Sequence, residues 1–155
     1  ARAPFQVLVF PFLTGDSFRY ALFRRMVSEG GYWQAIAGGG ENEETPIEAA
    51  AREANEEAGI AVDSDLFALD SVATIPVTNV SGFVWGPDMP VIPEYAFAVQ
   101  VPDADLTISA EHTEYAWFDY QSASQALHWD SNVTALWELD YRLRNSIWRA
   151  RQVRA

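Results

Sequence analysis

Three glutamates that lie close together in the chain, Glu53, Glu56 and Glu57, are the residues best suited to chemistry. Each residue of an α-helix advances by about 100°, so on a helix this spacing places the three carboxylates within an arc of roughly 100°. Like charges this close repel one another unless a hard divalent cation lies over them, because Mg²⁺ and Mn²⁺ prefer oxygen ligands. A solvated acidic surface is the alternative interpretation.

The surrounding residues predict the helix that carries these glutamates. Thr45, Pro46 and Glu48 combine an N-cap threonine, a proline at the first helical position and a capping-box glutamate. Gly59 is typical of the residue that follows a helix. The small apolar residues between these ends fill an arc beside the acidic one, which predicts close packing on a sheet: Ile47, Ala50, Ala51, Ala54 and Ala58.

The context of the helix favours the metal interpretation over the solvated surface. A run of three glycines, Gly38 to Gly40, precedes the helix and predicts a loop. Arg52 lies one helical turn from both Glu48 and Glu56, so it can pair with and orient a carboxylate. The apolar arc also fixes which face the acidic residues occupy.

The composition excludes several other functions. The 155 residues fit one ordinary domain, and 49% hydrophobic content rules out a disordered chain. The absence of cysteine and the presence of only two histidines exclude a thiolate zinc site and a histidine-rich one. A net charge of −12 argues against non-specific binding to nucleic acid or to an anionic membrane. An acidic enzyme acting on phosphates would need metal ions to offset its own charge.

Apolar runs predict strands at residues 5–12, 20–23, 72–77, 95–101 and 116–120 and a second helix from Asn132 through Ile147. Strands interspersed with helices predict an α/β fold, a mixed sheet covered by helices on both faces. The long connection 78–93 is expected to be a substrate loop.

The chain shows neither a membrane-spanning run nor a convincing signal peptide, so we expect a cytoplasmic protein.

Eight positions between residues 38 and 60 resemble the signature of the Nudix hydrolases. They follow the spacing G-x5-E-x7-R-E-U-x-E-E-x-G-U, where U is aliphatic and Ala54 is the one smaller substitute: Gly38, Glu44, Arg52, Glu53, Glu56, Glu57, Gly59 and Ile60. The resemblance implies a single Nudix domain over residues 1–155, folded as an α/β/α sandwich. The flanks are similar to the branch that hydrolyses dATP and dihydroneopterin triphosphate: Trp33, Gln34, Glu111, His112, Tyr115, Trp117, Asp119, Ala126, Leu127, Ser131 and Asn132.

The resemblance also implies roles for individual residues. Glu53 and Glu57 would be ligands of Mg²⁺, or of Mn²⁺ in its place, and Glu56 a ligand or the partner of a metal-bound water. Glu111 would be a distant fourth carboxylate, acting as ligand or general base. The backbone carbonyl of Ala37 would also reach a metal. Arg52 would orient Glu53 and Glu56 without touching substrate.

The substrate contacts stay open between functional and structural interpretations. Arg24 either binds a phosphate through its guanidinium or forms a surface salt bridge, and its neighbour Arg25 is expected to point the other way. Arg2, close to the first strand, is a second and less favoured candidate for a phosphate contact. Trp33, with Phe83 and Trp85, either stacks on a base or packs in the core or a dimer interface. Asn132 either contacts a base edge or caps the helix, and His112 either assists Glu111 or is structural.

The function that the resemblance implies is Mg²⁺-dependent pyrophosphohydrolysis, which the acidic residues suit. Water attacks a phosphorus of a nucleoside or pterin triphosphate, and a monophosphate and pyrophosphate are released. A second hypothesis keeps the chemistry but changes the substrate to dinucleoside polyphosphates, nucleotide sugars or capped RNA. A third is a Nudix domain that binds a nucleotide without hydrolysis. The arginine-rich C-terminal stretch is interpreted as a solvated helix end, or as the contact of a homodimer.

Overall fold

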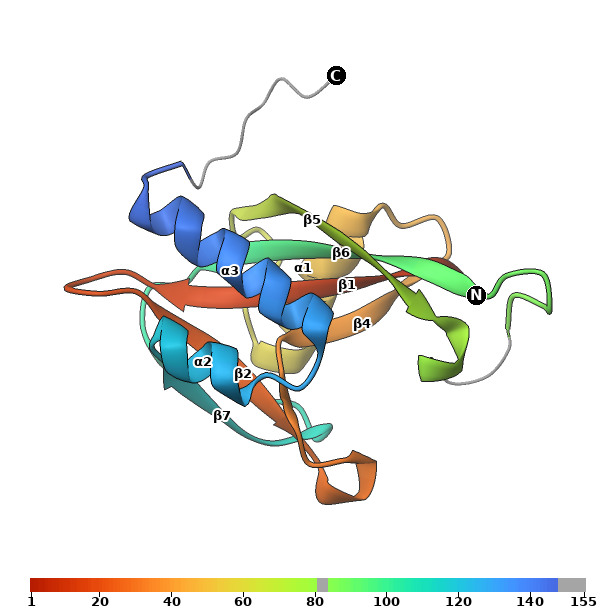
Figure 1. Cartoon of the computed structure of the whole chain (residues 1–155), viewed down its shortest axis with the longest axis horizontal. Helices are drawn as coiled ribbons and strands as arrows, with labels where there is room; N and C mark the ends of the chain where they lie inside the picture. The colour runs from red at the N-terminus through yellow and green to blue at the C-terminus, as the bar shows by residue number, and fades with distance from the viewer. Residues whose placement is uncertain (81–83, 148–155) are drawn as a thin grey trace.

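We describe the fold from a computed structural model, which describes residues 1–80 and 84–147. Its sheet is built around strand β1 (Arg2–Leu13), which pairs with three other strands (Figure 1). β2 (Arg19–Arg25) and β4 (Ile36–Glu41) run antiparallel to β1, and β6 (Val91–Gln100) runs parallel to it. A parallel neighbour makes the sheet mixed, as the sequence predicted.

Three further strands complete the seven-stranded sheet seen in the described part of the chain. β5 (Leu66–Pro76) pairs antiparallel with β6 at one edge. β3 (Trp33–Gln34) and β7 (His112–Phe118) both pair antiparallel with β2 on the other side. Short 3₁₀ turns, η1 (Val27–Glu29) and η2 (Val77–Asn79), follow β2 and β5.

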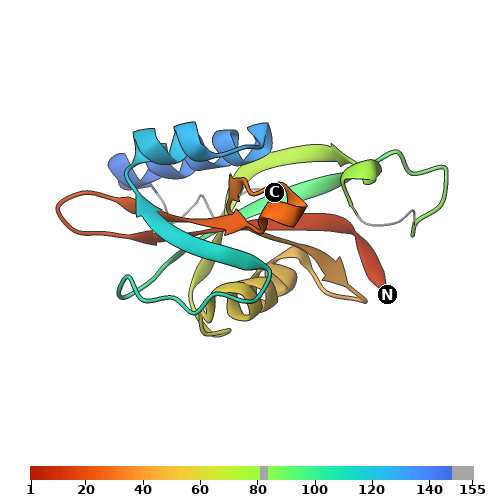
Figure 2. The ribbon, with the colours of Figure 1, turned by 90° about the horizontal axis from the view of Figure 1, so that it is seen from below.

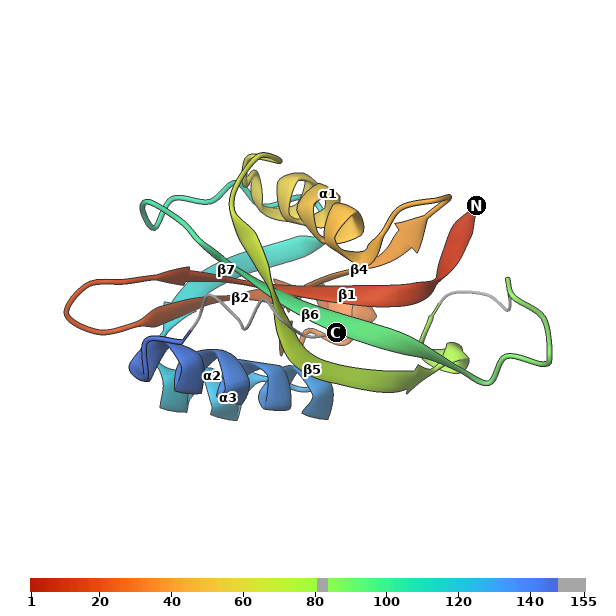
Figure 3. The ribbon, with the colours of Figure 1, turned by 90° about the horizontal axis from the view of Figure 1, so that it is seen from above.

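The helices lie on opposite faces of this sheet, as Figures 2 and 3 show from two sides. Helix α1 (Pro46–Ala58) covers one face, and α2 (Tyr120–Ala126) and α3 (Asp130–Arg144) cover the other. Each face has its own buried cluster: Val7, Val9, Ala21 and Phe23 belong to the α1 side, and Leu136 with its neighbours to the α3 side. The α/β/α arrangement expected from the sequence is therefore confirmed.

Helix α1 begins and ends where its sequence predicts. The Thr45 side chain accepts a hydrogen bond from the Glu48 amide (3.4 Å), and the Glu48 carboxylate accepts one from the Thr45 amide (2.9 Å). Gly59 closes the helix in the left-handed region, at φ 69°. The buried face differs slightly from the expected one. Ala49 and Glu57 are buried with Ala50, Ala54 and Ala58, whereas Ala51 is only partly buried and Ile47 in the first turn is 46% exposed.

Three other expectations need correction. The run Gly38 to Gly40 forms strand β4 rather than a loop, because its extended backbone pairs with β1. The second helix begins at Asp130 and ends at Arg144, so Ile147 lies beyond it and is exposed. The strand expected at 116–120 runs from His112 to Phe118 instead, because Asp119 caps α2, where its carboxylate accepts from the Ser122 amide (2.8 Å).

Candidate functional site

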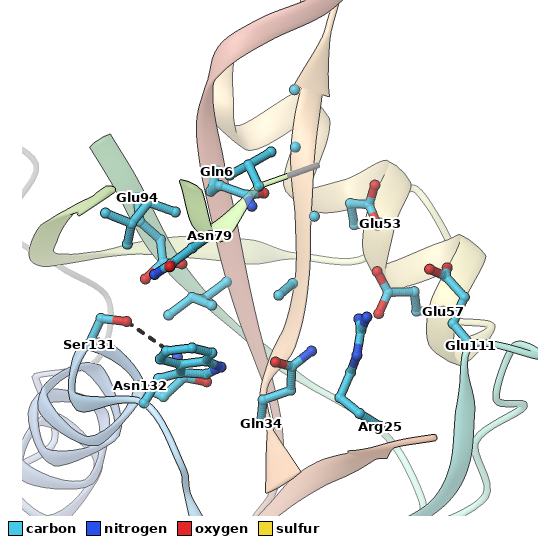
Figure 4. Close-up of a pocket in the computed structure, with 18 of the residues that line it drawn as sticks. Gln6, Arg25, Gln34, Glu53, Glu57, Asn79, Glu94, Glu111, Ser131 and Asn132 are labelled. Atoms are coloured by element: carbon cyan, nitrogen blue, oxygen red, sulfur yellow. Dashed lines mark hydrogen bonds between the residues drawn. The ribbon is translucent and has the colours of Figure 1, made fainter. Parts of the chain in front are cut away.

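A cavity of about 490 Å³ opens between β1, β4, the acidic face of α1 and the first turn of α3. Its volume is typical of a small-molecule site. Figure 4 shows that the lining side chains fall into two groups. Glu53, Glu57 and Glu111 lie at one end, which we call the carboxylate end. Neutral amides and one further acid form the opposite end, which we call the amide end: Gln6, Asn79, Glu94 and Asn132, with Gln34 between the two ends beside Arg25.

Arg52 holds the first carboxylates of the site in place. Its Nη1 donates to Glu53 (2.8 Å) and lies 3.2 Å from a Glu56 oxygen, and the contact with Glu56 is one of the two pairings that the helical spacing predicted. Its Nε and Nη2 donate to both oxygens of Glu44 (2.7 and 3.0 Å), and Nη2 also donates to the Gly39 carbonyl (2.8 Å). The bond to Arg52 lowers the pKa of Glu44. Arg52 therefore ties α1 to β4 and to the segment between them.

Glu57 is the buried member of the acidic group, with 3% of its surface exposed. Burial raises the pKa of Glu57 to about 10, helped by a hydrogen bond with Glu53 and by the charges of Glu53 and Glu111. Burial also lowers the pKa of His112, whose Nε2 lies 3.7 Å from Glu57. The two groups are therefore a neutral pair rather than an ion pair when no cation is bound.

The donor set at the carboxylate end fits a hard divalent cation. Carboxylate oxygens dominate it, and the buried Glu57 has the raised pKa expected where a missing positive charge would stabilise an anion. Gly38 leaves room for the Glu53 carboxylate, which a Cβ at that position would overlap. Within the described residues, no three acidic or histidine side chains stand ready to hold a metal ion as they are oriented here. The carboxylate donors and the buried Glu57 therefore fit a hard divalent cation such as Mg²⁺, although their side chains are not arranged around one here. The ligand roles of individual residues stay a prediction.

The remaining expected metal-site residues also line the cavity. Glu111 is exposed, precedes β7 and faces Glu57 from across the carboxylate end (Figure 4). Glu56 stands nearer solvent, with 53% of its side chain exposed. Ala37, whose carbonyl was expected to reach a metal, lies in β4 opposite Leu8 of β1. The structure therefore brings together every residue for which the resemblance implied a metal role.

The two neighbouring arginines of β2 exchange the places expected for them. Arg25 lines the cavity and points toward Glu57, whereas Arg24 is absent from the lining (Figure 4). Arg24 instead donates to Glu114 (3.1 Å) and to the Gly31 carbonyl (3.0 Å), the salt-bridge alternative left open by the sequence. A register shift in the β2–β7 pairing falls between the two arginines. Their expected alternation holds, but with the faces reversed.

Two of the aromatic residues for which base stacking was one alternative, Trp33 and Trp85, do not line the cavity. Trp33 packs edge-on against Phe118 (5.2 Å between ring centroids) and lies outside the cavity lining. Trp85 donates its indole N–H to the Arg2 carbonyl (3.0 Å). Phe83 lies outside the described residues. An aromatic residue that the sequence did not single out, Trp129, lines the cavity instead.

Arg2 and Asn132, the other two residues expected to contact substrate, both line the cavity. Arg2 lines the cavity beside Gly39, and its guanidinium is 5.9 Å from the Trp85 ring. Asn132 is 1% exposed and does not cap α3, whose N-cap is Trp129. Its Oδ1 accepts from the Ala35 amide (2.9 Å), a contact that joins α3 to the segment between β3 and β4. Capping, the structural alternative for Asn132, is therefore not its role.

Sequence reasoning missed three residues of the amide end, whereas it had named Asn132 as a candidate for a base contact. Gln6, Asn79 and Glu94 come from β1, η2 and β6, so no local spacing connects them. One signal was present, since Glu94 is an acid beside the apolar run 95–101. An acidic residue within a buried strand is uncommon without a partner or a function.

A family model describing the NUDIX domain matches residues 5–137, and the chain therefore belongs to the NUDIX family, as the spacing of the glutamates predicted. A Listeria monocytogenes structure described as a NUDIX hydrolase is 43% identical, covers 93% of this chain and 97% of its own, and has a TM-score of 0.82. The Escherichia coli dihydroneopterin triphosphate pyrophosphohydrolase shares the fold, with 23% identity, 91% and 97% coverage and a TM-score of 0.77.

A curated relative, an octanoyltransferase of Myxococcus xanthus, is 35% identical over 116 residues. The match covers 73% of this chain but 30% of that relative, so the chain spans less than a third of its length. Among the helices of the described residues, none is long and apolar enough to span a bilayer.

Proposed function

We propose that the chain is a Mg²⁺-dependent pyrophosphohydrolase that cleaves a nucleoside or pterin triphosphate to the monophosphate and pyrophosphate. The observation that carries this proposal is the cavity with two unlike ends. Clustered carboxylates suit a metal-bound polyphosphate, and amides suit a flat polar heterocycle. A cavity of about 490 Å³ accommodates a molecule of this kind.

At the carboxylate end, Glu53 and Glu57 would hold the metal, with Glu56 and Glu111 at the more exposed side. Bound Mg²⁺ supplies charge neutralisation to the polyphosphate and makes a coordinated water more acidic. Arg25, which points into this end, would bind a phosphate oxygen through its guanidinium, and Arg2 is placed to do the same beside β4. Arg52 would keep Glu53 and Glu56 in position.

In the reaction, water attacks a phosphorus next to the oxygen that bridges the α- and β-phosphates. A bond forms between the water oxygen and phosphorus, the bond to the bridging oxygen breaks, and one proton is released. A carboxylate takes the proton from water, and Glu56 and Glu111 both reach solvent where such a transfer is feasible. Separate Glu56→Gln and Glu111→Gln variants distinguish them, because the variant that loses the base loses kcat with little change in metal affinity.

The test is release of pyrophosphate or of single phosphate from a panel of ribo- and deoxynucleoside triphosphates and dihydroneopterin triphosphate, with and without Mg²⁺. We expect pyrophosphate from one preferred compound and no release without a divalent cation. Turnover restricted to dinucleoside polyphosphates, nucleotide sugars or capped RNA would replace the triphosphate proposal. Nucleotide binding without any turnover would identify a non-catalytic binder.

Glu57→Gln is the sharpest variant for the metal role. It should lower kcat by at least about 100-fold, since even indirect partners of a metal ligand contribute on the order of 10- to 100-fold. Because Glu57 is buried and already neutral without a cation, the variant should melt at the wild-type temperature or higher in the absence of metal. Wild-type turnover by this variant would remove Glu57 from the metal site.

A further inference from the structure

Glu94 stands at the amide end of the cavity without a full set of partners. It lies in β6, in register with Gln6 of the parallel strand β1, and is 8% exposed. Its Oε1 is buried and receives no hydrogen bond in the described structure. Figure 4 shows Glu94 beside Asn79, at the opposite side of the cavity from Glu53 and Glu57.

Among the described residues, none donates a hydrogen bond to Glu94 Oε1. A buried carboxyl oxygen without a donor destabilises the folded state, because water has been removed and no hydrogen bond replaces it. Burial raises the pKa of Glu94, and a hydrogen bond with Ser131 works in the opposite direction. The carboxyl group is therefore suited to a ligand that brings its own donors.

The surrounding walls suit a planar, polar ring. Trp129 lines the cavity and is held edge-on by Tyr32 (5.5 Å between centroids) and His128 (4.6 Å). Asn132 is fixed by the Ala35 amide at its Oδ1, and its Nδ2 donates to Ser131 (3.3 Å). Rigid walls of this kind orient a ring without requiring side chains to be ordered when the ligand binds.

We propose that Glu94 selects the heterocycle of the substrate by accepting two adjacent N–H groups, the ring N–H and the exocyclic amino group of a 2-amino-lactam. An ionised carboxylate only accepts hydrogen bonds, and its two oxygens match two parallel donors. Guanine and the pterins both present this pair of donors. Adenine and cytosine place a ring acceptor beside the amino group, and uracil flanks one N–H with two carbonyls, so each would direct an acceptor at the carboxylate.

This inference rests on the proposed function and deepens it, because it names the substrate class that the cavity would accept. A protonated Glu94 would offer one donor and one acceptor instead of two acceptors. It would therefore match the amino group and the ring nitrogen of adenine. Two donors from a bound ring stabilise the ionised form, which is why the 2-amino-lactam is the pairing we expect. A preference for adenine nucleotides is an outcome that overturns the proposal.

The experiment compares kcat/KM for GTP, ITP, ATP and dihydroneopterin triphosphate with the wild-type chain. ITP differs from GTP by lacking the 2-amino group, so it removes one of the two donors. We expect GTP to exceed ITP by about 10-fold or more, because a site built for a hydrogen bond rejects a ligand that lacks it. Guanine and the pterin carry the same edge, and the ratio of their rates identifies which ring the cavity holds.

Glu94→Gln tests the residue itself, because glutamine offers one acceptor and one donor. The variant should lower kcat/KM for GTP by about 10-fold or more, narrow the difference between GTP and ITP, and raise the relative rate with ATP. Glu43→Gln removes the same charge from an exposed position outside the cavity lining and should keep the wild-type order of substrates. Equal rates for GTP, ITP and ATP in the wild type would overturn the proposal.

Binding of GMP and IMP, measured by calorimetry without Mg²⁺, separates this inference from the proposed function. A preference for GMP that Glu94→Gln abolishes supports the role of Glu94 even if the chain hydrolyses some other class of guanine-containing compound. Hydrolysis of triphosphates with no preference between GMP and IMP leaves the proposed function in place and refutes the role of Glu94.

Discussion

Arg52 is the side chain on which the geometry of the carboxylate end depends. Its planar guanidinium reaches Glu44, Glu53 and the Gly39 carbonyl at once, which a lysine ammonium cannot do. The side chain is 22% exposed, so these contacts are only partly screened by solvent. Arg52 therefore contributes to stability as well as to the orientation of Glu53.

We expect Arg52→Lys to lower the free energy of unfolding by about 1–2 kcal/mol, because several hydrogen bonds to charged or carbonyl oxygens are lost. Urea denaturation measures this change. Arg24→Lys is the matched control, since Arg24 is 43% exposed and pairs with the half-exposed Glu114. That exposed pair should change stability by less than about 0.5 kcal/mol. Equal effects from the two variants would contradict the role of Arg52.

Glu94 gives a prediction about pH. Burial holds its pKa in the folded state above the ordinary value of 4.5, so the folded chain keeps a proton that the unfolded chain has lost. The contribution of Glu94 to stability is thus fully present below that ordinary value and is lost as the pH rises through the folded-state pKa. Without ligand, the melting temperature of wild type should therefore fall with rising pH more steeply than that of Glu94→Gln. Parallel pH profiles of the two proteins would contradict this.

Strand β4 makes room for the Glu53 carboxylate through a glycine, Gly38. Gly38 lies in this strand directly beneath the Glu53 carboxylate of α1. Its backbone is extended and unstrained, so the glycine serves the close approach of strand and helix and not a special dihedral angle. A methyl group at this position would displace the Glu53 side chain and leave the fold intact.

Gly38→Ala should therefore reduce kcat on the order of 100-fold, the effect of misplacing a catalytic group by about 1 Å, while the melting temperature changes little. Gly15→Ala in the β1–β2 turn is the control, because a Cβ at Gly15 would meet no atom within 4 Å. A Gly38→Ala enzyme with normal kcat, or one that fails to fold, would show that the close contact with Glu53 does not matter in this way.

Local sequence patterns predicted the elements whose ends and faces are set by nearby residues. Helix α1 was predictable because Thr45, Glu48 and Gly59 interact within the element. The clustering of Glu53, Glu56 and Glu57 followed from helical spacing alone. Strands β1 and β2 contain the predicted strands 5–12 and 20–23, and the register Phe12 opposite Tyr20 pairs them antiparallel.

Features that depend on distant pairing were not predictable. Which of Arg24 and Arg25 faces the cavity depends on the register of β2 with β7, which no local pattern reveals. The glycine run forms a strand because β1 supplies its hydrogen bonds. Asn132 bonds to Ala35, far away in the chain, so capping was the nearest local explanation available. Glu94 was overlooked for the same reason.

The charge of the whole molecule should make its stability sensitive to cations. The chain carries a net charge of −12, and several of its acidic residues line the cavity, where their carboxylates repel one another. Sodium chloride screens this repulsion, whereas Mg²⁺ held at the carboxylate end, as proposed above, would also bind the folded state directly. We expect a few millimolar MgCl₂ to raise the melting temperature more than NaCl of equal ionic strength. Glu57→Gln should abolish this difference, and an equal response to both salts would argue against a specific site.

The arginines near the C-terminus partly offset the acidic charge through pairs within α3 and with the sheet. Arg142 lies 2.7 Å from Glu138 and 3.1 Å from Asp70, and Arg144 lies 2.7 Å from Asp140. The other arginines of this stretch, Arg149, Arg151 and Arg154, lie outside the described residues. Their interpretation as a dimer contact stays a prediction, which the oligomeric state in solution would test.

The parallel pairing of β1 with β6 also constrains the order in which the chain can fold. β1 precedes the other strands in the chain and occupies the middle of the sheet, yet its neighbour β6 and the covering helix α3 follow much later in the sequence. Pairing between such distant segments slows folding, because a long loop must close before any contact forms. Until then the apolar face of β1, including Phe10 and Phe12, is open to other chains and to chaperones. The cavity needs residues from β1, from β6 and from the start of α3, so it is among the last parts of this fold to form.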